Sequence, residues 1–283
     1  MALDRYRFQV MDRPMLDIAL DWAAQEGWNP GLSDGDCFFA ADRTGFLMGF
    51  LDDRPVASIS AVKYSSDFGF IGLYIVDAAQ RGRGLGIAIW NEAMVSLRGR
   101  IVGLDGVISQ QANYRKSGFE FAHRNIRFAG SASTRGLPCS QIVDLQTMDS
   151  DLIRSYDLGH FPARRGAFLR VWMRQLGSRA LGWKEGGVLL GMGCVRPCRE
   201  GYKIGPLNAD SAEIAEALFD ALCERLPEGA KIYLDVPEPN RAALDLAIRR
   251  GMQPAFETAR MYAGGRAELP LQHIFGITSF ELG

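Results

Sequence analysis

The stretch that decides the fold is residues 68–87, which read FGFIGLYIVDAAQRGRGLGI. Its first nine residues are nearly all apolar and predict a buried strand that runs into a turn rich in glycine and arginine. The residues of this turn are Arg81, Gly82, Arg83, Gly84 and Gly86. A helical pattern follows, so unpaired backbone N–H groups and the positive end of a helix would point into the turn. The segment therefore predicts a binding site for an anion such as a pyrophosphate.

Two familiar nucleotide-binding motifs do not fit this turn. A G-x-G-x-x-G fingerprint beginning at Gly82 needs glycine at position 87, where the sequence has Ile87. A P-loop needs Gly-Lys followed by Ser or Thr, and the segment contains no such run. The glycines therefore indicate a different kind of phosphate-binding turn.

Outward from this segment, the sequence predicts two halves with the same order of elements. In the first half we expect helices over 12–27, 87–99 and 114–118, and strands over 46–51, 56–62, 68–76, 101–108 and 119–128. In the second half we expect helices over 164–176, 211–226 and 240–250, and strands over 187–195, 202–205, 231–236 and 253–262. The small, polar residues 131–138 are the candidate linker. The predicted fold class is α/β with a mixed sheet (α+β), and the repeated order favours an internal duplication.

Composition excludes several classes of protein. The 283 residues carry 32 Lys plus Arg and 33 Asp plus Glu, so the net charge of −1 gives no electrostatic reason to bind nucleic acid or an anionic membrane. No apolar run reaches the ~18 residues of a membrane helix, and the first ten residues are charged rather than signal-like. The five cysteines are scattered and the three histidines lie far from them, so we expect no metal site. We expect a cytoplasmic protein; a homo-oligomer is left open.

Two motifs carry a resemblance to a known family. Arg81-x-x-Gly84-x-Gly86 resembles the acyl-CoA motif R/Q-x-x-G-x-G/A of the GNAT superfamily of N-acetyltransferases. Tyr114-x-Lys116-x-Gly118-Phe119 is similar to that family's second signature, Y-x-K-x-G-F. The whole chain further resembles bacterial tandem-GNAT proteins. The resemblance implies a catalytic, acetyl-CoA-binding domain over 1–132 and a degenerate GNAT-like domain over 139–283 that binds substrate or is structural.

The resemblance also implies roles on the donor side, with acetyl-CoA as cosubstrate and no metal. Backbone N–H groups of 82–86 would bind the CoA pyrophosphate, and the strand edge at Ile75 and Val76 would pair with pantetheine, the Val76 N–H polarising the acyl carbonyl. Tyr114 would protonate the leaving thiolate. The expected cofactor contacts are Ile75, Val76, Arg81, Gly82, Arg83, Gly84, Leu85, Gly86 and Asn113.

The acceptor side is less marked in the sequence. A carboxylate usually helps an amine to lose its proton, and Glu26, after the first helix, is our first choice. Further candidates for the acceptor pocket are Trp28, Asn29, Asp36, Tyr64 and His160. In the second half, the loop 206–211 lacks glycine and arginine, and Ala247 stands where the first half has Tyr114. We therefore expect only the first half to bind CoA.

Several functional readings stay open. We expect direct acetyl transfer, in a ternary complex, to a primary amine of a small molecule, amino acid or peptide, since Cys37 has no histidine nearby in sequence to make it a nucleophile. Transfer of a longer acyl chain is one alternative. The others are a non-catalytic acyl-CoA sensor or partner-binding module and a plain nucleotide-phosphate binder.

Overall fold

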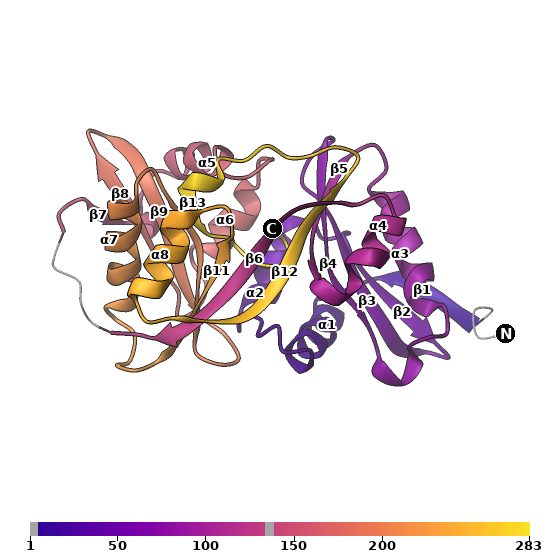
Figure 1. Ribbon diagram of the computed structural model, residues 1–283. Helices are drawn as coiled ribbons and strands as arrows, with labels where there is room; N and C mark the ends of the chain where they lie inside the picture. Colours follow the sequence, from indigo (N-terminus) through magenta and orange to yellow (C-terminus); the bar gives the residue numbers. More distant parts are fainter. Residues whose placement is uncertain (1–4, 134–138) are drawn as a thin grey trace.

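The computed structural model describes residues 5–133 and 139–283, and it joins their strands into one mixed sheet (Figure 1). The order of the strands in this 13-stranded sheet is β1-β2-β3-β4-β5-β12-β6-β11-β10-β9-β8-β7, with β13 pairing beside β10. The mixed α/β class is confirmed. None of the helices in these residues combines the length and the apolarity that crossing a membrane requires.

The first half follows the predicted order closely. Its elements are β1 (Tyr6–Val10), α1 (Arg13–Gln25), α2 (Asp34–Ala41), β2 (Phe46–Leu51), β3 (Arg54–Lys63), β4 (Phe68–Val76), α3 (Leu85–Ser96), β5 (Ile101–Val107), α4 (Gln111–Lys116) and β6 (Glu120–Ser131). Asp12 caps α1 as expected, because its side chain accepts a hydrogen bond from the Met15 N–H at 2.9 Å. The short elements β1 and α2 were not predicted from the sequence.

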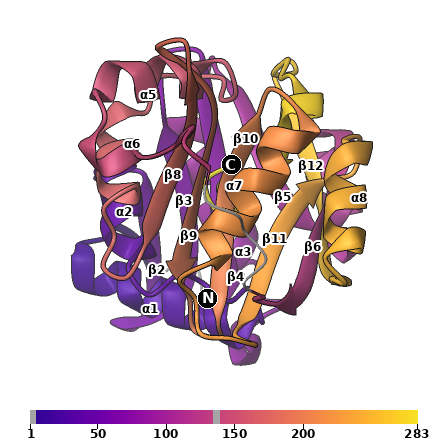
Figure 2. The same cartoon turned by 90° about the vertical axis from the view of Figure 1, so that its left-hand side faces the viewer.

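The second half repeats this order. Its elements are β7 (Ile142–Asp144), α5 (Ser150–Leu158), α6 (Gly166–Trp172), β8 (Arg179–Glu185), β9 (Val188–Pro197), β10 (Tyr202–Ala209), α7 (Ala212–Cys223), β11 (Lys231–Pro237), α8 (Arg241–Arg249), β12 (Gln253–Ala263), the short 3-10 helix η5 (Leu271–His273) and β13 (Ile274–Gly276). Figure 2, in which this half faces the viewer, shows α7 lying along the sheet with α5 and α6 on the other side. The expected strand at 202–205 is longer than predicted and reaches Ala209.

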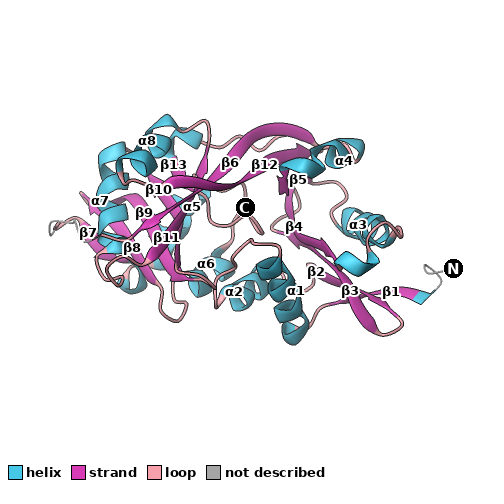
Figure 3. Ribbon diagram, turned by 60° about the horizontal axis from the view of Figure 1, so that its bottom comes forward, coloured by secondary structure: helices cyan, strands magenta, loops and turns pink. Residues whose placement is uncertain are grey.

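The two halves exchange one strand each. The strand β12, from the second half, pairs with β5 of the first half, while β6, from the first half, pairs with β11 of the second. The exchanged strands are antiparallel to each other and run side by side across the middle of the molecule (Figures 1 and 3). The proposed division at 132 and 139 is therefore crossed by strand pairing. Of the candidate linker, Ser131 ends β6 and residues 134–138 lie outside the described residues.

A shared apolar core also joins the halves. It contains Leu16 and Phe38 from the first half and Phe168 and Trp172 from the second, together with Leu282 near the chain end. The rings of Phe38 and Trp172 are stacked with centroids 6.5 Å apart, which packs α2 against α6. Burial of these side chains favours a fixed arrangement of the two halves. Figure 3 places the C-terminus in this central region.

Candidate active site

A cavity of about 650 Å³ lies along β4 and receives side chains from both halves. The predicted site residues that line it are Glu26, Trp28, Ile75, Val76, Arg81, Gly82, Gly84, Leu85, Gly86 and Tyr114. Phe256 and Thr258 of β12, and Phe280 and Glu281 near the chain end, add a wall that the sequence analysis did not predict. The exchanged strand therefore completes a site whose glycine turn belongs to the other half.

The cavity opens because β4 and β5 separate. These parallel strands pair only as far as Ile71 and Leu104, whereas on its other edge β5 pairs with β12 from Val102 to Val107. Within β4, the register with β3 slips by one residue, and Leu73 takes the left-handed φ of 46° that side-chain-bearing residues rarely adopt. The hydroxyl of Ser58 donates a 2.7 Å hydrogen bond to the Leu73 carbonyl and holds this bulge. The strained residue thus lies where the edge of β4 becomes free.

The glycine turn forms one end of the cavity. Gly82 and Gly84 have φ of 76° and 80°, and a Cβ added at either position would meet no heavy atom within 4 Å. Gly84 is also the N-cap of α3, where no side chain caps the helix in the described structure and no acidic residue lies in the first turn. By contrast, the Ser211 hydroxyl caps α7 by accepting from the Ile214 N–H. The turn before α3 therefore fits an anionic ligand.

Arg81 links this turn to the end of β4 and to Glu26. Its Nε donates to the Val76 carbonyl at 2.9 Å, and its guanidinium forms an ion pair with Glu26. Glu26 is 39% exposed and lies on the cavity wall, but its carboxylate is already engaged by Arg81. This ion pair favours a role for Glu26 at the end of the cavity formed by the glycine turn.

Tyr114 lies farther along the cavity, on α4. Its ring packs 5.6 Å from that of Trp90, and a Cβ on Gly106 would lie 2.8 Å from the Tyr114 Cδ2, so the close approach requires glycine at 106. Burial, together with nearby Tyr74, raises the pKa of Tyr114 to about 12. Burial also raises the pKa of Tyr74, which lines the same cavity. Both phenols therefore keep their protons at neutral pH.

Glu281 is the main functional candidate that the sequence analysis missed. It is 2% exposed, lines the cavity, and neither carboxylate oxygen has a hydrogen-bond partner among the described residues. A buried polar group without a partner is costly, so such a group points to a ligand. The only sequence signal was a single acidic residue inside the last apolar segment of the chain, 269–282.

Buried cations surround Glu281, but other carboxylates already hold most of them. Arg127 pairs with Asp235 at 2.7 Å, and Arg196 pairs with Asp34 at 2.8 Å. Burial lowers the pKa of Lys203 to about 8, with Arg127 acting in the same direction and Glu281 in the opposite one.

The same cations position the acceptor wall. Arg127 Nη1 and Lys203 Nζ donate to the Trp28 carbonyl at 2.8 and 3.0 Å. Lys203 belongs to the second half, so this half holds a loop of the first half in place.

The structure does not bring two predicted cofactor contacts to the cavity. Arg83 is exposed and hydrogen-bonds Gln80 within the turn. Asn113 is exposed on α4, where its amide nitrogen donates to Gln110 Oε1 at 2.7 Å. Both side chains lie outside the lining because the outer surface of the turn and of α4 faces solvent.

Two predicted acceptor residues, Asn29 and Asp36, are engaged away from the cavity. Asn29 binds the second half, where its side chain donates to the Glu200 carbonyl at 3.0 Å and accepts from the Glu200 N–H at 2.9 Å. Asp36, at the start of α2, pairs with Arg13 of α1 at 2.7 Å. These contacts join elements rather than face a ligand.

Tyr64 and His160 lie outside the cavity as well. The Tyr64 hydroxyl donates to the Leu282 carbonyl at 3.0 Å, so this residue supports the segment that carries Glu281. Burial raises the pKa of Tyr64. His160 follows α5, with its Nδ1 2.9 Å from the Tyr156 carbonyl. The fold therefore directs His160 to a separate part of the second half.

Comparisons with known proteins agree with this geometry. Residues 13–119 match the Acetyltransferase (GNAT) family, and residues 153–276 match an Acetyltransferase (GNAT) domain. The chain is 29% identical over 266 residues to a holothin acyltransferase of Pseudoalteromonas sp. (strain SANK 73390), covering 94% of this chain and 90% of that protein.

Solved structures share the fold. A putative acetyltransferase from Pyrococcus horikoshii superposes with a TM-score of 0.82 at 23% identity, covering 99% of this chain and 96% of that one. A tandem GNAT protein from the clavulanic acid biosynthesis pathway superposes with a TM-score of 0.63 at 13% identity, covering 93% and 100%. At these identities the likeness concerns the fold alone.

Proposed function

Because the chain belongs to the GNAT family of acyltransferases and carries two GNAT domains, we propose that its first half transfers an acetyl group from acetyl-CoA to a primary amine. The acceptor is an amine of a small molecule, amino acid or peptide. The observation that carries this proposal is the single cavity along β4, with an uncapped glycine turn at one end and Tyr114 and Glu281 farther along. A sensor of acyl-CoA would need the turn but neither of these two side chains.

The donor would lie along the free edge of β4. Its pyrophosphate fits the backbone N–H groups that precede α3, where Arg81 adds positive charge. The amide groups of pantetheine would pair with β4 beyond Leu73, where β5 has separated from it. This pairing would direct the thioester carbonyl toward the Val76 N–H and the thioester sulfur toward Tyr114.

The chemistry needs one proton acceptor and one proton donor. The amine nitrogen attacks the thioester carbonyl carbon, so a C–N bond forms and the C–S bond breaks. The Glu281 carboxylate takes the proton that the amine loses, and the Tyr114 phenol gives its proton to the leaving thiolate. Glu26 is the alternative proton acceptor, but its pairing with Arg81 favours Glu281.

The walls indicate the character of the acceptor. Trp28, Phe256 and Phe280 contribute aromatic surface next to the Glu281 carboxylate. An ammonium group attached to a flat or apolar body fits this combination of charge and aromatic surface. The acyltransferase relative is named for holothin, which makes holothin a rational first acceptor to test.

The test is a thiol-release assay with acetyl-CoA and an amine panel that includes holothin. Glu281→Gln should lower kcat/KM by ~10²-fold or more while acetyl-CoA still raises the melting temperature. Glu120→Gln, at an exposed carboxylate that begins β6, is the matched control. If Glu26→Gln loses activity and Glu281→Gln does not, the proton acceptor is Glu26. If acetyl-CoA binds but no amine is acetylated, the sensor alternative stands.

A further inference from the structure

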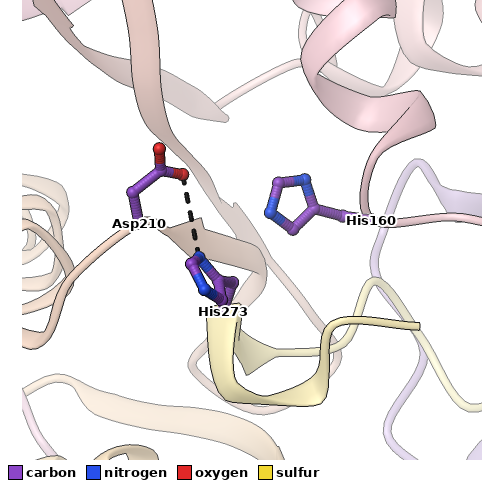
Figure 4. Close-up of side chains that lie close together, drawn as sticks. All are labelled: His160, Asp210 and His273. Atoms are coloured by element: carbon purple, nitrogen blue, oxygen red, sulfur yellow. Dashed lines mark ion pairs between the residues drawn. The ribbon is translucent and has the colours of Figure 1, made fainter.

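Three side chains with metal-binding atoms meet in the second half. His160 follows α5, Asp210 lies between β10 and α7, and His273 ends η5 (Figure 4). One ligand atom from each lies within 4.8 Å of the other two. The cluster is separate from the catalytic cavity, whose lining includes none of the three.

A single residue, Tyr156, orients two members of the cluster. Its carbonyl oxygen lies 2.9 Å from the His160 Nδ1, which directs a proton to Nδ1 and leaves the lone pair of Nε2 available. Its hydroxyl donates to Asp210 Oδ1 at 3.0 Å. Metal-binding histidines characteristically donate their second N–H to a carbonyl or carboxylate, and metal-binding carboxylates are themselves hydrogen-bonded.

The charges also suit a cation. Among the described residues, no lysine or arginine forms an ion pair with Asp210, and the His273 Nδ1 lies 3.9 Å from its carboxylate. The Asp210 side chain is 42% exposed and that of His273 is 33% exposed, so both can rotate and an ion can enter from solvent.

We propose that His160, Asp210 and His273 bind one divalent first-row transition-metal ion, with water completing its coordination. Zn²⁺, Co²⁺ and Ni²⁺ prefer a ligand set of two imidazoles and one carboxylate, whereas Mg²⁺ and Ca²⁺ do not. Ligand atoms around Zn²⁺ lie roughly 3.4 Å apart, given metal–ligand distances of about 2.1 Å. Rotation of the two exposed side chains closes the observed separation of up to 4.8 Å.

Such an ion would tie the chain end to the body of the second half. His273 directly precedes β13, and the segment after β13 carries Glu281 into the catalytic cavity. Bound metal would hold this segment against α5 and the end of β10. The site does not depend on the proposed acetyl transfer, since its ligands lie outside that cavity.

The experiment titrates the full chain, without an affinity tag, with Zn²⁺ in a calorimeter and with Co²⁺ by visible absorption. One ion should bind per chain. His273→Ala and Asp210→Asn should each weaken binding by about 100-fold or more, and Tyr156→Phe by about 10-fold. Asp245→Asn, at an exposed carboxylate on α8, is the matched control and should bind as the wild type does.

Hydrogen exchange gives a second measurement that does not depend on activity. With Zn²⁺, the amides of residues 271–276 should exchange more slowly in the wild type and not in His273→Ala. Circular dichroism establishes that each variant is folded. If His273→Ala and Asp210→Asn both bind Zn²⁺ with unchanged affinity, the metal binds at another site, such as a cysteine, and the proposal is overturned. Absence of any binding to the folded wild type at a large excess of Zn²⁺ would overturn it as well.

Discussion

Gly72, in the middle of β4, lies directly against the backbone of Glu281, so that a Cβ added to Gly72 would lie 2.9 Å from the Glu281 Cα. The chain end of the second half thus reaches the strand of the first half along which the donor is proposed to bind. The close approach requires a residue without a side chain at position 72 and brings a buried carboxylate into the cavity along β4.

Gly72→Ala should therefore displace Glu281. We expect kcat/KM to fall at least ~10-fold, with a loss of about 1–3 kcal/mol in the free energy of unfolding from overpacking. Gly69→Ala, in the same strand, is the control because its Cβ would meet the Leu97 side chain and the Val62 carbonyl and not the chain end. Equal losses of activity in both variants would mean that general damage to β4, and not Glu281, is responsible.

Tyr114→Phe should lower kcat by about 10²- to 10⁴-fold, the usual contribution of a general acid, while leaving acetyl-CoA binding intact. Tyr202→Phe, on the half-buried face of β10, is the matched control. The melting-temperature shift with acetyl-CoA separates binding from turnover. If Tyr114→Phe retains full activity, the proton donor would instead be Tyr74, which lines the same cavity.

The raised pKa of Tyr114 also predicts a pH dependence. Burial raises it from the ordinary 10.0 to about 12, so the folded protein binds this proton more tightly than the unfolded chain does. The stability linked to this group is therefore complete below pH 10 and is lost as pH rises toward 12. Urea unfolding across this pH range should show a smaller loss in the free energy of unfolding for Tyr114→Phe than for the wild type. Equal losses would contradict a raised pKa at Tyr114.

Gly84→Ala tests the glycine turn. A Cβ at this left-handed N-cap should weaken acetyl-CoA binding by ~10-fold or more, because side chain and strain both disturb the phosphate-binding backbone. Gly99→Ala, just beyond the other end of α3, has nearly the same φ of 83° and equally open surroundings. Both variants should lose about 1 kcal/mol of stability, but only Gly84→Ala should bind acetyl-CoA less tightly. If Gly84→Ala and Gly99→Ala bind acetyl-CoA with similar affinity, the pyrophosphate does not bind at this turn.

Arg196→Met tests the buried ion pair between the halves. Asp34 and Arg196 are both fully buried, so removal of the arginine leaves an unpaired carboxylate and should cost about 3–5 kcal/mol in urea unfolding. Asp21 and Arg199 also join the halves but are exposed, and Arg199→Met should cost less than about 1 kcal/mol. Similar losses in the free energy of unfolding in the two variants would show that the buried ion pair contributes no more stability than the exposed one.

Local patterns predicted the parts of the site that are continuous in sequence. The apolar run of β4, the turn from Arg81 to Gly86 and the start of α3 depend on near neighbours, and the structure has them at the predicted positions. Tyr114 joins them because only one strand and one short helix separate it from α3. The repeated order of elements agrees with two matches to GNAT domains, one in each half.

Strand exchange was not predictable in the same way. The strands β6 and β12 were both expected, yet their residues do not specify with which half's strands each one pairs. An alternating apolar pattern indicates that a strand is buried, but it does not indicate which strand lies beside it. The wall formed by Phe256 and Thr258 follows from that exchange and was therefore missed.

The sequence by itself determined the family and predicted the glycine turn before α3 and the helix that carries Tyr114, because glycines, capping and strand-to-helix transitions act over a few residues. Only the tertiary structure decided that Glu281 enters the cavity beside Gly72 and that His160 and His273 meet at Asp210. These groups are far apart along the chain, and burial of the shared apolar core and pairing of the exchanged strands bring them together.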